Sequence, residues 1–349
     1  MSDESTPTPI ITDNALLDAW RTLMYFDNMS ASGRKNFKWL RRLVIAITLI
    51  ISVISVLSLM FSFSQSIQWI ILALPIIGLN LMSYTSSYSA PTVWIEHRYA
   101  AEKIRSEIYL YRSSAEKYAV PKNQQDNILQ KEVAQVLREA PHGISDEDLN
   151  DSKAFNEDPI KMIQGALTSS EDDDGFKDLS DKEGFEQYIK TRINGQINWY
   201  RNKVKKDYIE GKHINQFSII LVTIGSVIGL IAGSQESQSH WIGLFAIVNA
   251  TGMALNAYSN VNMTGRTYGI YDKTWKELKI SLSAWNAQLN DDGFNEETQR
   301  PLFVENIENI LMGELDKWYE VATEVQITND TSLKNGFDNS ANGTAGTTG

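Results

Sequence analysis

Four long runs without a charged residue constrain this sequence more than any other feature. Residues 43–61 and 67–84 form one pair of runs, and residues 214–233 and 241–258 form a second pair. A helix that crosses the hydrocarbon core of a bilayer, about 30 Å thick, needs roughly 20 apolar residues. Each run is close to that length, and only a short break separates the members of each pair. The pattern predicts two transmembrane helical hairpins with four spans.

Composition agrees with a membrane protein whose apolar residues are concentrated in those runs. Only 42% of the 349 residues are hydrophobic, so the rest of the chain is hydrophilic. The formal net charge of −11 shows no basic excess, and we therefore expect no nucleic-acid partner. The absence of cysteine excludes disulfides, thiol nucleophiles and cysteine-ligated zinc. Because a polar segment precedes residue 43, we interpret the first run as a retained span rather than a cleaved signal peptide.

Basic residues lie on both sides of each predicted hairpin, before its first span and after its second. Lysine and arginine close to short loops favour the cytoplasmic side of a membrane. Five of them precede the first span with no acid among them: Arg34, Lys35, Lys38, Arg41 and Arg42. Residues 98–105, 201–212 and 266–279 are also rich in lysine and arginine. We therefore expect a multi-pass protein in the lipid bilayer with both termini cytoplasmic.

The regions outside the runs predict helices, one linker and two tails. We expect disordered tails at 1–12 and 326–349 and an acidic, solvated linker at 141–184. Between them lie a first two-span unit at 13–140 and a second at 185–325. The expected fold is an all-α membrane protein with two tandem transmembrane hairpins, whose long cytoplasmic helices form a bundle.

Helical periodicity marks the faces that should pack in this bundle. The apolar residues recur at steps of three and four, as expected for one face of a helix. They are Leu16, Trp20, Leu23 and Met24 before the first span, Ile104, Ile108 and Tyr111 after the second, and Phe303, Ile307, Ile310 and Leu311 near the C-terminus.

An internal repeat relates the two units. An offset of 174 residues carries Leu43 onto Phe217 and Tyr111 onto Trp285. The order of a helix, two spans and two further helices occurs in both units. Because each unit has an even number of spans, both would have the same orientation, unlike the inverted repeats of many transporters.

Two segments of the first unit resemble a known bacterial family. They are the basic approach to the first span (KWLRRL, residues 38–43) and the helix after the second (WIEHRYAAEKIRSEIYLY, residues 94–111). In the second unit the residues at similar places are Tyr268, Trp275, Glu277, Leu278 and Trp285, followed by Glu314 and Trp318. The chain resembles a tandem repeat of the SLATT family, the SMODS- and SLOG-associating two-transmembrane effector domains.

This resemblance implies a non-enzymatic effector in the bacterial inner membrane that acts in anti-phage defence. Members of the family are proposed to form pores when a nucleotide-sensing partner signals, so that the infected cell dies or stops growing. The sequence contains no fused nucleotidyltransferase or sensor domain, so the resemblance implies that a separate nucleotide-sensing protein is the partner.

The first run contains a row of hydroxyl side chains. Thr48, Ser52, Ser55 and Ser58 follow one another at steps of four and three residues, which places them within roughly 120° of a helix. A water-accessible pore lining has this pattern. Serine and threonine also hydrogen bond to neighbouring helices in membrane bundles. We treat the four as candidate pore-lining residues and leave packing as the alternative.

Glycine and asparagine mark the second hairpin. Gly225, Gly229 and Gly233 form two overlapping GxxxG motifs, which let helix backbones approach closely. These residues and Gly252 are candidates for helix packing, either within the chain or between subunits. Asn249 and Asn256 lie in the fourth run, where a buried amide needs hydrogen-bond partners. They are candidate pore-lining residues, and hydrogen bonds between helices are the alternative.

Catalytic and metal-binding patterns are missing from the sequence. No Walker loop, GxSxG or HExxH motif occurs, and the acidic residues 171–174 lack the ligand spacing of a calcium loop. We expect no enzyme activity, no cofactor and no metal. No run contains a charged side chain, which also disfavours proton pumps, voltage sensors and ion-coupled transporters.

These observations together predict an oligomeric membrane pore. Four helices of one chain leave little room for water, so a conducting pore requires a homo-oligomer. The cytoplasmic helices would gate it, and it would pass ions or small solutes with little selectivity. The alternative is a membrane scaffold that conducts nothing and recruits cytosolic partners through residues 92–140 and 266–325. A small transporter is a third possibility.

Overall fold

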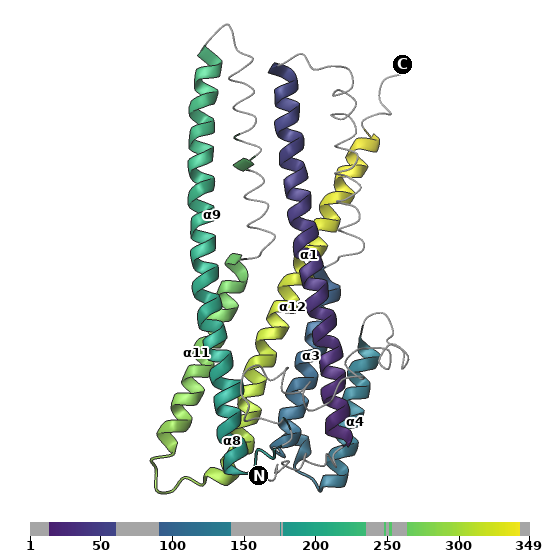
Figure 1. The fold of residues 1–349 in the computed structure, drawn as a ribbon, viewed down its shortest axis with the longest axis vertical. Coiled ribbons are helices and arrows are strands. Elements are labelled where there is room, and N and C mark those ends of the chain that lie inside the picture. The colour runs from purple at the N-terminus through teal and green to yellow at the C-terminus, as the bar shows by residue number, and fades with distance from the viewer. Residues whose placement is uncertain are drawn as a thin grey trace, which may run out of the picture. The chain divides into compact units, whose positions relative to one another are not determined.

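The structure is a computed structural model, and it describes residues 14–60, 91–140, 175, 177–234, 248, 251–252 and 264–342. Within these ranges the regular elements are helices and none is a strand, as the sequence predicts (Figure 1). Their order is α1 (Asn14–Met60), α3 (Pro91–Arg112), η1 (Glu116–Tyr118), α4 (Lys122–Glu139), α8 (Lys182–Tyr188), η2 (Ile189–Ile193), α9 (Asn194–Ser234), α11 (Thr264–Gln288) and α12 (Glu296–Asn342).

The chain divides into two compact units, and each unit combines distant parts of the sequence. Unit 1 consists of Met1–Ala31, Trp94–Trp199 and Thr274–Tyr319, and unit 2 consists of Ser32–Val93, Tyr200–Lys273 and Glu320–Gly349. Unit 1 therefore contains helices that lie outside the four uncharged runs, and unit 2 contains the runs themselves. The helices α1, α3, α9, α11 and α12 each contribute residues to both units.

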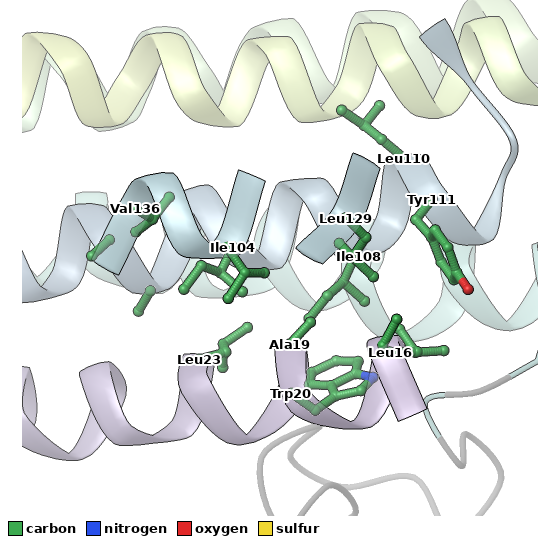
Figure 2. Close-up of a cluster of buried hydrophobic side chains, with 14 of the residues drawn as sticks. Leu16, Ala19, Trp20, Leu23, Ile104, Ile108, Leu110, Tyr111, Leu129 and Val136 are labelled. Carbon is green, nitrogen blue, oxygen red and sulfur yellow. The ribbon is translucent and has the colours of Figure 1, made fainter. Parts of the chain in front are cut away.

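The first layer of unit 1 is a core formed by α1, α3 and α4. Figure 2 shows Leu16, Trp20 and Leu23 of α1 directed toward Ile104 and Ile108 of α3, with Leu129 of α4 beside them. All six side chains are at most 2% exposed. Periodicity alone therefore identified the packed faces of α1 and α3 correctly. Burial of several such side chains, each worth about 1.5–3 kcal/mol, is the main stabilising term of this layer.

The second layer of unit 1 is an aromatic core formed by α8, α11 and α12. The ring centroid of Trp285 lies 5.1 Å from Phe185 and 4.6 Å from Phe303. Phe294, in the turn before α12, packs edge-to-face on Trp285 at 5.3 Å. The helix α12 begins where the Asn295 side chain accepts a hydrogen bond from the backbone N–H of Thr298, an N-cap arrangement. The helix therefore starts before Pro301 and not after it.

The last residues of the segment predicted as a solvated linker belong to unit 1 and pack against other parts of it. The indole of Trp20 donates a hydrogen bond to the carbonyl of Gly175 at 3.0 Å. Leu179 is fully buried, and its backbone N–H donates to the carbonyl of Arg112 at 2.8 Å. The prediction of a solvated linker as far as residue 184 therefore differs from the structure at 175 and 177–184. The reason is that one apolar side chain and several backbone groups find partners there.

Unit 2 contains two helices that are longer than the sequence predicts. The helix α1 continues from Asn14 through the basic flank and includes residues 43–60 of the first run. Similarly, α9 continues from Asn194 through residues 214–233 of the third run. Within the described ranges, Lys182–Leu230 is the one helix that is long and apolar enough to cross a membrane, and 11% of its most apolar window is buried.

The other expected spans lie largely outside the described residues. This applies to all of 67–84 and to 241–258 except for residues 248 and 251–252, which are helical.

At the C-terminus, α12 extends to Asn342, whereas the sequence predicts disorder from 326. No proline occurs between 326 and 342 to interrupt the backbone hydrogen bonds.

Gly184 in α8 provides a test of the packing in unit 1. A Cβ atom at this position would collide with the backbone carbonyl of Asp178. We therefore expect Gly184→Ala to destabilise unit 1 by about 1–3 kcal/mol, as overpacked substitutions do. The measurement is the thermal melting temperature of the full chain in detergent.

Gly195→Ala is the matched control, because a Cβ at that helical position would meet nothing within 4 Å. It should raise stability by about 0.5–1 kcal/mol, since alanine is the better helix former. Equal effects of the two substitutions would contradict the close approach of Asp178 to α8.

Candidate functional site

A turn of π-helix interrupts the long helical segment that begins at Lys182. This turn is η2, and both of its ends continue directly into α-helix. Turns of π-helix occur mostly as single-turn insertions and are frequent at functional sites. The turn contains Arg192, whose side chain is 4% exposed although it belongs to one of the most polar residue types. A guanidinium at this depth requires partners.

The main partner of Arg192 is Glu308 of α12, whose side chain is 1% exposed. Nη2 of Arg192 donates to Oε2 at 2.9 Å, and Nε donates to Oε1 at 3.2 Å. The contact is therefore bidentate, the geometry in which arginine binds a carboxylate most strongly. The hydroxyl of Tyr188 donates to Oε1 of the same carboxylate at 2.9 Å.

A continuous chain of charges leads from this pair to the first layer of unit 1. Nη1 of Arg192 lies 3.5 Å from Oε2 of Glu102 on α3. The other oxygen of Glu102 accepts from Arg105 Nη1 at 2.6 Å, and Nη2 of Arg105 donates to Asp27 of α1 at 2.6 Å. We call Asp27, Arg105, Glu102, Arg192 and Glu308 the ion-pair chain. It connects α1, α3, η2 and α12, and thus links the two layers.

Two tyrosine rings flank the arginine. The guanidinium carbon of Arg192 lies 5.2 Å from the ring centroid of Tyr109, within the range of a cation–π contact. The rings of Tyr109 and Tyr188 are 5.1 Å apart. Burial raises the pKa of Tyr188 well above its usual value, with the charge of Glu308 next in effect. Tyr188 therefore stays protonated and donates to Glu308 at any physiological pH.

The electrostatics around Glu102 keep its carboxylate ionised. Burial alone would raise the pKa of Glu102, but Arg105, Arg192 and Arg98 outweigh it and lower the pKa to about 2. Such a carboxylate cannot act as a general base or acid near neutral pH, since the catalytic pKa must lie near the operating pH. The arrangement therefore suits holding four helices in one register rather than proton transfer.

A groove in unit 1 is the second notable feature. It has a volume of about 550 Å³ and lies between α3, α4 and α12. The hydroxyl of Tyr99 donates to Asp316 at 3.0 Å, and burial, followed by that hydrogen bond, raises the pKa of Tyr99 to about 12. The groove has three carboxylates and one lysine: Glu96, Glu139, Asp316 and Lys103. This charge disfavours the phosphates of a nucleotide and suits a cationic group.

The hydroxyl row of the first run lies in α1. Thr48, Ser52, Ser55 and Ser58 are helical, and the surroundings of their side chains are outside the described part. Three side chains that the structure does describe, Ala46, Ile50 and Val53, are exposed. At about 100° per residue these three lie on the opposite side of α1 from the hydroxyl row. The exposed side chains that the structure describes in this part of α1 are thus apolar.

The glycines of the second hairpin show contacts within the chain. Gly225 is buried and Gly229 half-buried in α9, and the surroundings of Gly233 are outside the described part. Gly252 is buried, and a Cβ there would lie 3.9 Å from Cγ2 of Val222. This contact fits packing inside the chain, and dimerisation through the same motifs stays a prediction. Asn249 and Asn256 lie outside the described residues.

Sequence reasoning missed the ion-pair chain, although a signal for it exists. Arg192 follows Phe185 and Tyr188 at the spacing of one helix face, and Glu308 lies between Val304 and Leu311 on another. A single charged residue in an otherwise apolar stripe indicates a buried, paired charge. Two such residues of opposite sign in the same chain would have suggested the pair.

Comparison with known families identifies most of the second half of the chain. Residues 188–318 match the family described as SMODS and SLOG-associating 2TM effector domain 1. The second half of the chain thus matches a SLATT domain, as the sequence resemblance predicts. It begins at Tyr188 and includes Arg192 and Glu308.

The first half of the chain matches a different family, described as a protein of unknown function (DUF4231), over residues 21–126. Asp27, Glu102 and Arg105 lie in this range, so the ion-pair chain joins the two matched segments. A second SLATT match is absent, and the tandem SLATT repeat therefore stays a prediction. Curated proteins and solved structures give no match to the chain.

The ion-pair chain predicts a steep cost for removing one buried charge. Arg192→Leu leaves Glu308 buried without its guanidinium and should cost about 3–5 kcal/mol. The double variant Arg192→Leu with Glu308→Leu should recover most of that loss, because it removes both charges. The measurement is the melting temperature of the detergent-solubilised chain.

The control is the exposed pair of Lys182 and Glu186, whose side chains are 71% and 64% exposed at 3.9 Å. Lys182→Leu should change stability by less than about 0.5 kcal/mol, as most surface substitutions do. A double variant that melts no higher than Arg192→Leu alone would contradict the pairing.

Proposed function

We propose that this protein is a homo-oligomeric pore-forming effector of the bacterial inner membrane that acts in anti-phage defence. The description of its SLATT domain as a two-transmembrane effector domain supports a membrane effector. The exposed apolar length of α9 supports contact with lipid, since a soluble protein would bury such a helix. Permeabilising the membrane would require no catalytic residue.

The observation that carries the proposal is the continuity of two helices between the units. The helix α1 begins with buried side chains in unit 1, and α9 begins in unit 1 directly after the buried Arg192 and Ile193; both end in uncharged segments of unit 2 and are drawn as uninterrupted coils in Figure 1. A helix with all of its backbone hydrogen bonds intact is stiff along its axis. A change in packing at the unit 1 end would therefore move the unit 2 end.

The ion-pair chain is the element through which a partner would control this movement. It fixes α1, α3, η2 and α12 to one another, and buried charge pairs resist partial opening because a lone buried charge is costly. A separate nucleotide-sensing protein that docks on unit 1 and breaks one pair would release the rest. On this proposal the bundle would have two arrangements, a closed one with all pairs made and an open one with the ion-pair chain disrupted.

Two observations support the tandem two-span organisation. The 174-residue offset carries the matched range 21–126 onto 195–300, inside the SLATT match at 188–318. It also carries core residues of the first layer onto core residues of the second. The pairs are Ile104 with Leu278, Tyr111 with Trp285, Leu129 with Phe303 and Val133 with Ile307, all of them buried. Two related two-span units, 13–140 and 185–325, with the same orientation would place both layers of unit 1 on one side of the membrane.

The predicted topology can be tested with single cysteines, because the natural chain has none. Both termini and unit 1 should be cytoplasmic, so a cysteine replacing Lys131 on α4 should react with a membrane-impermeant maleimide only after lysis. Cysteines replacing Ser64 and Ser237, in the predicted outer loops, should react in intact spheroplasts. Labelling of the Lys131→Cys variant in intact spheroplasts would overturn the topology.

Pore formation can be tested by leakage of a dye from liposomes that contain the purified chain, together with toxicity on expression. The hydroxyl row of α1 is the expected lining. Ser52→Leu with Ser55→Leu should therefore abolish leakage and toxicity, because it replaces two hydroxyls by large apolar groups, while the amount of protein in the membrane stays unchanged.

Ala46→Leu is the matched control, since it adds comparable bulk on the exposed, opposite face of α1. It should leave leakage unchanged. Leakage that survives the double serine substitution would exclude α1 as the lining. A natural chain that neither leaks dye nor harms cells would support the alternative, a membrane scaffold that recruits cytosolic partners through residues 92–140 and 266–325.

A further inference from the structure

The groove between α3, α4 and α12 combines an apolar floor with acidic side chains. Its volume of about 550 Å³ is within the range of small-molecule sites, about 300–1,000 Å³. Ala100 and Val136 line the groove and are 5% and 3% exposed. Two of its acids reach farther into solvent, since the Glu139 side chain is 55% exposed and Asp316 is an exposed residue. A ligand in the groove therefore meets apolar surface as well as carboxylates.

The groove is acidic overall. We call Glu96, Glu139 and Asp316 the acidic lining; together with Lys103 they give the groove a formal charge of −2. Nζ of Lys103 contacts Oε2 of Glu139 at 3.3 Å, so the groove already holds one ammonium group. Asp316 accepts a hydrogen bond from the hydroxyl of Tyr99 at 3.0 Å, and this neutral donor does not cancel the charge of the carboxylate. The groove has charge to hold further cations.

The polar groups of the groove follow α3 at intervals of about one turn. Glu96, Tyr99 and Lys103 are three and four residues apart, the spacing of one helix face. Tyr99 contacts Asp316 of α12, and Lys103 contacts Glu139 of α4. Because Tyr99 and Lys103 are about 6 Å apart along the helix axis, acids from two other helices meet α3 at two successive turns. This arrangement suits a linear cation that carries more than one charge.

The geometry of the groove also selects among kinds of cation. In the part of the chain that the structure describes, no three acids or histidines are placed to hold a metal ion. The ring centroids of Tyr99 and Tyr319 are 5.8 Å apart with the ring planes at 53°, so the rings contact each other and leave no slot between them. Quaternary ammonium groups, which lack N–H donors, are bound by aromatic rings that surround them. A primary ammonium group instead donates hydrogen bonds to carboxylates and needs no such cage.

We propose that this groove binds a linear aliphatic diamine or polyamine, with its methylene chain over Ala100 and Val136 and its ammonium groups on the acidic lining. A lysine side chain of a partner protein has the same chemistry but offers one ammonium group, which would use only one of the two turns. The lining residues all belong to unit 1, so the inference does not depend on the proposed pore. A bound amine would connect three helices of unit 1.

The binding test is isothermal titration calorimetry of the full chain in detergent, at low salt and equal ionic strength. The ligands are putrescine, butylamine, choline and Mg²⁺. Putrescine should bind roughly fivefold more tightly than butylamine, because its second ammonium group adds one partly exposed ion pair. It should also bind more tightly than choline, which cannot donate a hydrogen bond through nitrogen. Mg²⁺ should not displace putrescine.

Substitutions in the groove should shift the affinity for putrescine in opposite directions. Asp316→Asn with Glu96→Gln keeps the shape of both side chains and should weaken binding roughly tenfold, about threefold for each carboxylate. Lys103→Gln removes the ammonium group that occupies Glu139 and should tighten binding roughly threefold, a gain that a misfolded chain cannot produce. Glu297→Gln is the matched control and should change nothing, because this exposed acid of α12 is about 28 Å along the helix from Asp316.

Several results would refute the inference. Equal affinity for putrescine and butylamine would assign the groove to a single ammonium group, such as a lysine of a partner protein. Displacement of putrescine by Mg²⁺, or choline binding as tight as putrescine, would mean that charge alone is recognised. Unchanged affinity in the double variant, or in Lys103→Gln, would place the amine elsewhere. Failure of the proposed function looks different, since the leakage assay contains no amine and a chain that leaks no dye can still bind putrescine.

Discussion

The buried ion pair of Arg192 and Glu308 constrains the packing of unit 1, because each charge needs the other as a well-aligned partner. Removing either charge from water costs several kcal/mol, and only a well-aligned partner repays that cost. The bidentate contact therefore fixes the depth and rotation of η2 against α12. Because Glu102 extends the chain toward Arg105 and Asp27, the same requirement reaches α3 and α1. Apolar side chains form the core of each layer, and the ion-pair chain fixes how the two layers pack against each other.

The helices α1 and α9 both continue from unit 1 into uncharged segments, where a different physical constraint applies. From residue 43 in α1 and from residue 214 in α9, the uncharged runs contain no side chain that could form an ion pair. Hydrocarbon supplies no hydrogen-bond partners, so a backbone that crosses it must satisfy its own groups, and a continuous helix does so. On the proposed membrane location, α1 and α9 therefore need no break where their charged segments give way to the uncharged ones.

Sequence reasoning succeeded where packing is local and failed where it depends on distant partners. The periodic residues Leu16, Ile104 and Phe303 are buried, as their spacing predicts. The acidic composition around residue 180 predicts solvation, yet the Leu179 side chain is buried and its backbone N–H donates to the carbonyl of Arg112 on α3. The candidate site was harder still, because the sequence marks Arg192 and Glu308 only as single charges in apolar stripes and the fold alone places them together.

The sequence by itself determined that this chain is helical and that its apolar residues are gathered in membrane-length runs, because periodicity and the absence of charge act over neighbouring residues. Its SLATT resemblance was equally readable from short segments of the sequence, each of them within a single helix. Only the tertiary structure decided which charges are buried as partners. Arg192 and Glu308 are separated by 116 residues, and Arg192 and Glu102 by 90. Local patterns can mark a charge that lies in an apolar stripe, but they do not show which charges meet over such separations, since the pairs form only when the layers they join have packed.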